Sequence, residues 1–154
     1  MTTKETAAAI RTALKTAGYG RDVVSVRVSG GSVEVTVKSA TIKFSRVEEI
    51  AGKFEKIDRC YATGEILCGG NTFVFVRADE DMMDKRIAEV RVAAEAAGLN
   101  AAGWARFGFG GVVYEVQESM ALVADSDGCG NRIGSPYMRD VSEAIRAVAS
   151  HSLG

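Results

Sequence analysis

Three cysteines and a single histidine are the residues of this sequence best suited to covalent or metal chemistry. Cys60 and Cys68 lie near Asp58 and Glu65, which would suit a thiolate nucleophile beside an acidic group. This stretch lacks a histidine base, because His151 stands far along the chain. One histidine and scattered cysteines also cannot assemble an ordinary zinc site. We therefore predict that the protein is not an enzyme and has no catalytic residues, metal or cofactor.

A short acidic segment resembles the start of a calcium-binding loop. Asp125 and Asp127 alternate with other residues and are followed by Gly128, an arrangement that can wrap a hard cation. Cys129 then occupies the position of a third oxygen ligand, and Pro136 stands where a bidentate glutamate closes such loops. The pattern therefore predicts a solvated loop rather than a calcium site.

Two glycine-rich segments, 68–71 and 107–111, could approach a phosphate group or a base. A phosphate cradle normally leads into the N-terminus of a helix. Both segments lead instead into runs of β-branched and aromatic residues that are typical of strands. We therefore predict that both are turns of β-hairpins.

The composition limits the class of protein that carries these residues. The chain has 154 residues, of which 47% are hydrophobic and 25% charged, so one domain or two smaller units with a sizeable core are expected. A net charge of -1 gives no overall attraction to phosphate backbones or anionic lipid. No eighteen apolar residues run together and no leader pattern is present, so we expect no membrane contact and a cytoplasmic location. The odd number of cysteines favours free thiols.

The spacing of apolar residues predicts the elements that position the candidate residues. In the first half they are a helix over 3–17, a hairpin over 24–37, a helix starting near Ser45 and a second hairpin over 64–76. In the second half they are a helix over 81–97, a hairpin over 104–116, a strand over 120–124, a loop over 125–134 and a last helix starting at Ser135 and Pro136.

These elements predict an α+β fold of antiparallel hairpins and sheets packed against helices. We expect an α-β-β-α-β-β unit over 1–78 and an α-β-β-β-α unit over 79–154. Sliding the sequence by 80 positions lays 10–39 over 90–119 and places Gly30 and Gly31 on Gly110 and Gly111. This echo predicts two tandem copies of one unit, with chance similarity of common residues as the alternative.

The same periodicity predicts the core. The run 73–76 is apolar throughout, so we expect it to be buried on both faces. The expected core residues are Ile10, Leu14, Val26, Val35, Ile50, Phe54, Phe73, Phe75, Ile87, Val90, Tyr114, Val141 and Ile145.

Aromatic and basic residues on strands suggest a second class of function. Arg27, Arg106, Phe107 and Phe109 could form a surface on which the bases of a single strand stack. The chain has no clustered run of Lys or Arg to hold a nucleic-acid backbone. Nucleic-acid binding is therefore the alternative rather than the leading hypothesis.

The first half of the chain resembles a known family. The segments AAIRTALKTAGY (8–19), VSVRV (24–28), SVEVTVK (32–38), VEEIAGKFE (47–55) and GEILCGGNTFVFV (64–76) are similar to the large polyvalent protein-associated domain 29 family. The resemblance implies a module of phages and conjugative elements that acts against host defences, and it implies no catalytic residues.

The leading hypothesis is a non-catalytic accessory protein of a phage or mobile element that binds another protein. The resemblance implies that the partner is a host defence complex, such as a CRISPR or restriction nuclease, in the bacterial cytoplasm. Whether the chain also forms a homodimer is left open. The residues we expect to contact the partner are Arg59, Tyr61, Arg106, Asp125, Asp127 and Arg132, because exposed loops and basic or aromatic anchors commonly carry affinity.

Overall fold

The computed structural model describes residues 1–124 and 130–154, which form five helices and two sheets. The predicted α+β class is confirmed. The chain divides into two compact units, Met1–Asp79 and Glu80–Gly154, each with its own sheet and core.

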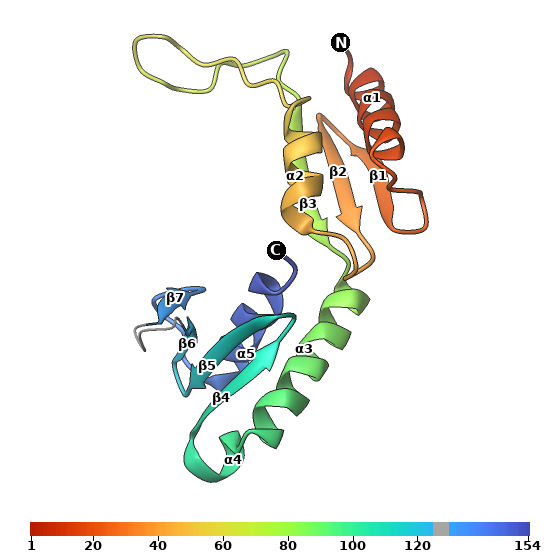
Figure 1. The fold of residues 1–154 in the computed structure, drawn as a ribbon. Helices are drawn as coiled ribbons and strands as arrows, with labels where there is room; N and C mark the ends of the chain where they lie inside the picture. The colour runs from red at the N-terminus through yellow and green to blue at the C-terminus, as the bar shows by residue number, and fades with distance from the viewer. Residues whose placement is uncertain (125–129) are drawn as a thin grey trace. The chain divides into compact units, whose positions relative to one another are not determined.

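The first unit is a three-stranded sheet covered on one face by two helices (Figure 1). β1 and β2 form the predicted antiparallel hairpin, and β3 pairs with the other edge of β2 in parallel. The helix before the hairpin starts at the predicted capping box, in which Glu5 N–H donates to Thr2 Oγ1 at 3.3 Å. The elements are α1 (Thr3–Thr16), β1 (Val24–Ser29), β2 (Ser32–Val37), α2 (Phe44–Gly52) and β3 (Phe73–Ala78).

The second unit is a four-stranded antiparallel sheet packed against two long helices (Figure 1). Its strands follow one another in space in the order of the sequence. The elements are α3 (Glu80–Ala96), α4 (Leu99–Ala102), β4 (Trp104–Phe109), β5 (Val112–Gln117), β6 (Met120–Val123), β7 (Asn131–Ile133) and α5 (Val141–His151).

The predicted second hairpin over 64–76 is wrong. Residues 73–78 form β3, which pairs in parallel with β2, so Ser32 lies beside Phe73 and Val37 beside Ala78. α2 makes the crossover that a parallel pair requires. The residues before β3 join no sheet and form an extended segment that is described below.

Two boundaries in the second half also differ from the prediction. Part of the expected loop forms β7, and the last helix starts at Val141 rather than at Pro136. Asp140 is the N-cap, and its carboxylate accepts a hydrogen bond from Glu143 N–H at 3.0 Å. A capping side chain defines a helix start better than a proline alone.

The strands of the two hairpins coincide under the 80-residue shift, but their buried faces do not. Val26 pairs with Val35 in the first unit, and Arg106 pairs with Glu115 at the equivalent positions of the second. Val35 is fully buried, whereas the second hairpin buries the alternate residues, among them Tyr114. The helices of the two units therefore cover opposite faces of equivalent hairpins, so strand side chains 80 positions apart do not correspond, whereas Ile10 and Val90 on the helices are both buried.

Most of the predicted core is buried, with two errors on β3. The fully or almost fully buried members are Ile10, Leu14, Val35, Ile50, Val90, Tyr114 and Ile145, and the half-buried ones are Val26, Phe54, Ile87 and Val141. Phe73 is half-buried, but it stacks on Phe75 outside the core cluster. Phe75 is 50% exposed, because β3 follows the alternation of a strand with one open face. The expectation that 73–76 is buried on both faces is therefore wrong.

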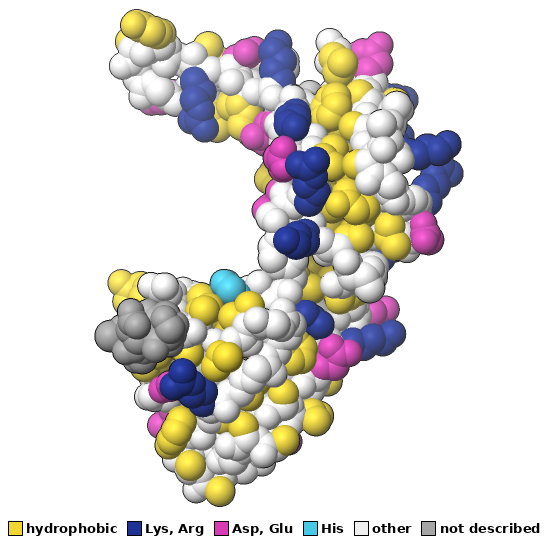
Figure 2. Space-filling view, viewed as in Figure 1, with side chains coloured by type: hydrophobic (Ala, Val, Ile, Leu, Met, Phe, Trp, Pro, Cys, Tyr) yellow, Lys and Arg dark blue, Asp and Glu magenta, His cyan; other side chains and the backbone are white. Residues whose placement is uncertain are grey.

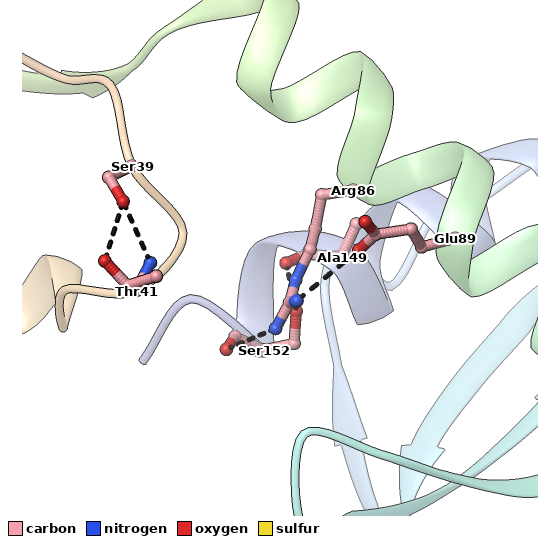
Figure 3. A network of polar contacts seen from close by, with 6 residues as sticks. All are labelled: Ser39, Thr41, Arg86, Glu89, Ala149 and Ser152. Atoms are coloured by element: carbon pink, nitrogen blue, oxygen red, sulfur yellow. Dashed lines mark hydrogen bonds and ion pairs between the residues drawn. The ribbon is translucent and has the colours of Figure 1, made fainter. Parts of the chain in front are cut away.

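One polar network ties the ends of the second unit together (Figure 3). Arg86 of α3 donates to Ser152 Oγ at 2.9 Å and to the Ser152 carbonyl at 3.3 Å. Its guanidinium also lies 4.5 Å from the ring centroid of Phe109. Ser152 Oγ in turn donates to the Ala149 carbonyl. Because Arg86 is mostly buried, these contacts hold α3 against the end of α5.

Candidate functional site

The segment that joins α2 to β3 leaves the sheet as a long protrusion (Figure 1). We call residues 56–72 the arm. Its two limbs run antiparallel, with bridges between Lys56 and Thr72 and between Arg59 and Ile66. The limbs reverse direction where Cys60 N–H donates to the Glu65 carbonyl at 2.8 Å. The arm is therefore a two-stranded ribbon with its own hydrogen bonds.

Asn71 joins the two limbs near the base of the arm. Its side-chain oxygen accepts from Asp58 N–H at 2.8 Å, and its amide donates to the Leu67 carbonyl at 2.7 Å. The residues between Leu67 and Asn71 bulge outward, and Gly69 and Gly70 take positive φ there. These glycines therefore form a bulge within one limb, and not the hairpin turn predicted at 68–71.

The arm carries large apolar side chains in water. Residues 61–70 are all exposed. Tyr61 is fully exposed near the end of the arm, and Ile66 and Leu67 are 46% and 47% exposed. Figure 2 shows hydrophobic side chains at the far end of the protrusion and again nearer its base. An apolar group held away from the core in this way is typical of a surface that binds another molecule.

The charges on the arm are largely used within it. Lys56 pairs with Asp58 at 3.5 Å, and Arg59 donates to the Gly64 carbonyl at 3.2 Å. Thr63 Oγ1 donates to Glu65 at 3.2 Å. The arm therefore presents Tyr61 near its end and Ile66 and Leu67 along one limb, among charges that are used within the arm.

Cys60 lies at the start of the reversal in the arm. The hydroxyl of Thr63, and the N–H groups of Thr63 and Ala62, favour the thiolate and lower the pKa of this thiol below its usual value. The thiolate is the reactive form of cysteine. Cys60 is half-buried and Cys68 is exposed. The acidic residues singled out beside them, Asp58 and Glu65, are engaged in the contacts described above.

The residues expected to contact a partner belong to both units. Arg59 and Tyr61 lie together on the arm, in the first unit. Arg106 and Arg132 belong to the second unit, on β4 and β7 at opposite edges of its sheet. Arg132 donates to the carbonyls of Ser119 and Pro136, at 3.5 Å and 3.0 Å, so it braces the loops beside β7. The remaining two, Asp125 and Asp127, lie outside the described residues.

The expected stacking surface on the second sheet is wrong. Arg106 and Trp104 point to the open face, and Trp104 is 50% exposed. Phe107 is buried in the core and Phe109 packs against it beneath the Arg86 guanidinium. Alternation along β4 sends these phenylalanines away from Arg106.

An aromatic face that the sequence reasoning missed lies on the open side of the first sheet. Arg27, Glu34 and Phe75 form one row across its three strands. The rings of Phe73 and Phe75 are nearly parallel with centroids 6.3 Å apart, and Arg77 pairs with Glu34 at 3.1 Å. Period-two alternation in FVFVRA would have revealed this face, because its valines and phenylalanines cannot all point inward.

His151 lies near the end of the sequence, but it belongs to a helix and has a hydrogen-bond partner. It is the last residue of α5, and its Nδ1 lies 2.9 Å from the hydroxyl of Tyr114. Burial raises the pKa of Tyr114 above its usual value. His151 also lines a surface pocket of about 710 Å³, with Tyr137 and Arg146 among its other walls.

Within the described residues, no three or more metal-ligating side chains are grouped. None of the described helices combines the length and apolar character that crossing a membrane requires. Compared with family models, curated proteins and solved structures, the chain has no significant match. The resemblance to the polyvalent-protein family therefore stays a hypothesis that rests on the quoted segments.

Proposed function

We propose that the protein works by binding another protein through the arm, with Tyr61 as its main anchor and without chemistry of its own. The observation that carries this proposal is the continuous exposure of residues 61–70 on a ribbon with internal hydrogen bonds. Tyrosine is enriched among the residues that dominate binding energy at interfaces. A hydrogen-bonded ribbon also loses less conformational freedom on binding than an unstructured loop.

The chemistry of the arm indicates the kind of partner surface that fits it. Its ionised side chains are paired or bonded within the arm, and it exposes Tyr61, Ile66 and Leu67. The matching surface is an apolar pocket on a folded protein, which takes the Tyr61 ring while its hydroxyl stays near the polar rim. Association through such a contact depends little on salt, because few charges change their surroundings.

The family resemblance suggests which proteins to test first. We propose that the partner is a component of a defence complex in a bacterial cytoplasm, such as a CRISPR or restriction nuclease, and that binding inhibits it. An inhibitor of this kind needs only a complementary surface. This finer proposal rests on the segments quoted above and not on the geometry of the arm.

The test compares two tyrosines that are both highly exposed. Tyr61→Ser removes the anchor on the arm, and Tyr137→Ser removes a ring that is 86% exposed in the second unit. Each variant is produced in phage-challenged cells that carry a CRISPR or restriction system. We expect the wild type and Tyr137→Ser to reduce protection, and Tyr61→Ser to leave protection intact. The partner recovered with the wild type should be lost with Tyr61→Ser alone.

Two results would count against this function. Unchanged protection in every system, together with no partner recovered by the wild type, removes the anti-defence proposal. If Tyr61→Ser converts a dimer into a monomer in analytical ultracentrifugation, the arm binds a second copy of this chain instead.

A second function is favoured by the open face of the first sheet. Phe73 and Phe75 stack beside Arg77 on this face, which suits the bases of a single strand. Binding of a single-stranded oligonucleotide should weaken as salt rises, since phosphate contacts release counterions. Phe75→Ala should reduce it, and a flat titration at low salt removes this alternative.

A further inference from the structure

A basic pocket lies between α1 and β1 of the first unit. None of the residues that line it belongs to the arm. It has a volume of about 630 Å³, within the range of small-molecule sites of about 300–1,000 Å³. Leu14, Tyr19, Val24 and Val26 are among the residues that line it. Polar groups of Thr12 and Ser25 also line it.

Four cationic side chains line this pocket: Arg11, Lys15, Arg21 and Lys38. No carboxylate belongs to its lining among the described residues, and none of the four cations forms an ion pair there. In Figure 2, Lys and Arg side chains gather at the edge of this unit beside α1 and β1. Like charges that share a lining without an ion pair repel each other, and a bound anion relieves that repulsion.

Two of the four cations, Arg11 and Lys38, contact backbone carbonyls. Arg11 donates to the carbonyl of Val26 on the free edge of β1 at 2.9 Å. Lys38 Nζ lies 3.4 Å from the carbonyl of Arg21, which ties the end of β2 to the loop before β1. Arg11 uses one guanidinium nitrogen in this bond, so its other donors can face a ligand.

The backbone carbonyls at the C-terminal end of α1 do not bind these cations in place of an anion. Gly18 takes a positive φ of 89°, and the chain folds back so that Tyr19 N–H donates to the Leu14 carbonyl at 2.9 Å. The carbonyls of Ala13 and Lys15 also accept hydrogen bonds from the following N–H groups. These carbonyls therefore have partners of their own.

We infer that this pocket binds an organic phosphate of about the size of a nucleotide. Guanidinium and ammonium groups form charge-assisted hydrogen bonds with phosphate oxygens, and two phosphates can use the four cations together. Tyr19 and the valines of β1 offer an apolar wall for the organic part. A free nucleotide and a nucleotide within a single-stranded nucleic acid both carry phosphate on an organic group. The test below distinguishes the two ligands.

The test is a calorimetric titration of the full chain at low salt. The probes are adenosine diphosphate, inorganic phosphate and adenosine, which carries no phosphate. We expect the diphosphate to bind more tightly than phosphate, and adenosine to give no heat. The variant Arg11→Gln/Lys15→Gln should weaken diphosphate binding about tenfold or more, because it removes two charged hydrogen-bond donors.

A charge-matched control separates the pocket from general attraction. Arg46→Gln/Lys53→Gln removes the same charge from α2, where both side chains pair with Glu49. It should bind the diphosphate as the wild type does, and so should Tyr61→Ser on the arm. If Arg11→Gln perturbs the circular dichroism spectrum, Lys15→Gln/Arg21→Gln tests the same prediction without breaking the Val26 bond.

Three results overturn the inference: no binding of diphosphate or phosphate by the wild type, equal loss in the α2 control, or strong binding of adenosine. A single-stranded oligonucleotide is the fourth probe. Its displacement by adenosine diphosphate assigns the pocket to a nucleotide within a strand. Oligonucleotide binding that the diphosphate does not displace, with no diphosphate binding of its own, overturns the inference as well.

Asp22 supplies a test in the opposite direction. Its carboxylate lies against Gly20, which lines the pocket. Removing this nearby negative charge by Asp22→Asn should tighten diphosphate binding. Weaker binding in this variant would contradict an anion site.

Discussion

The side chain of Asn71 accepts a hydrogen bond from the backbone N–H of Asp58 at 2.8 Å, across the two limbs of the arm. The same side chain donates to the Leu67 carbonyl within its own limb, and Leu67 N–H donates to the Asp58 carbonyl across the limbs at 2.8 Å. The arm is therefore held as a ribbon at the point where its backbone bulges.

Asn71→Ala should loosen the arm without unfolding the unit that carries it. Each lost hydrogen bond contributes about 0.5–1.5 kcal/mol to local stability. We expect faster hydrogen exchange at Asp58 and Leu67, and little change in the melting temperature. Asn100→Ala on exposed α4 is the matched control. Unchanged exchange at both amides would contradict the role assigned to Asn71.

Thr63→Val should raise the pKa of Cys60, because it removes the side-chain hydrogen bond that favours the thiolate. The N–H bonds to the sulfur remain, so the rise should be partial. The measurement is the pH dependence of alkylation at Cys60, with the other two cysteines replaced by serine. Thr16→Val on α1 should leave the midpoint unchanged. An unchanged midpoint in Thr63→Val would show that the hydroxyl does not act on this thiol.

The second unit should lose stability at alkaline pH, because the buried hydroxyl of Tyr114 then ionises. Burial raises its pKa in the folded state, so the folded protein holds the phenolic proton more tightly than the unfolded chain. This contribution is complete below the unfolded pKa of about 10 and is lost as pH rises through the higher folded pKa. Tyr114→Phe should flatten the loss of stability above about pH 10.

Trp104 fluorescence measures this effect, because the single tryptophan lies on β4 beside the strand that carries Tyr114. Urea unfolding is followed over a series of alkaline pH values. Tyr137→Phe, at an exposed position, should keep the wild-type slope. Equal slopes for the wild type and Tyr114→Phe would remove the buried phenol as the cause.

Phe75→Ala should destabilise the first unit less than Ile10→Ala does. Ile10 is fully buried, so its truncation costs about 2–5 kcal/mol. Phe75 is half-exposed and loses mainly its contact with Phe73, which predicts about 1–2 kcal/mol. Urea denaturation followed by circular dichroism compares the two. An equal loss would mean that Phe75 is buried in solution.

The sequence by itself determined the elements whose signals are local. The capping box of Thr2 and Glu5 defined the start of α1, and period-two alternation around Gly30 and Gly110 defined both hairpins. These features depend on contacts between residues close together in the chain. The α+β class followed from them. Arg59 and Tyr61 were expected to be exposed from residue type and position in a loop, and both are exposed.

Only the tertiary structure decided which strands pair and which face of each sheet is buried. Parallel pairing of β3 with β2 depends on the crossover through α2, which no local pattern around 73–76 encodes. A hairpin can bury either of its faces, and the packed helices select Val35 in one unit and Tyr114 in the other. The same selection turned Phe107 inward and left Phe75 in water. The basic pocket, too, combines residues from α1, β1 and the end of β2 that only folding brings together.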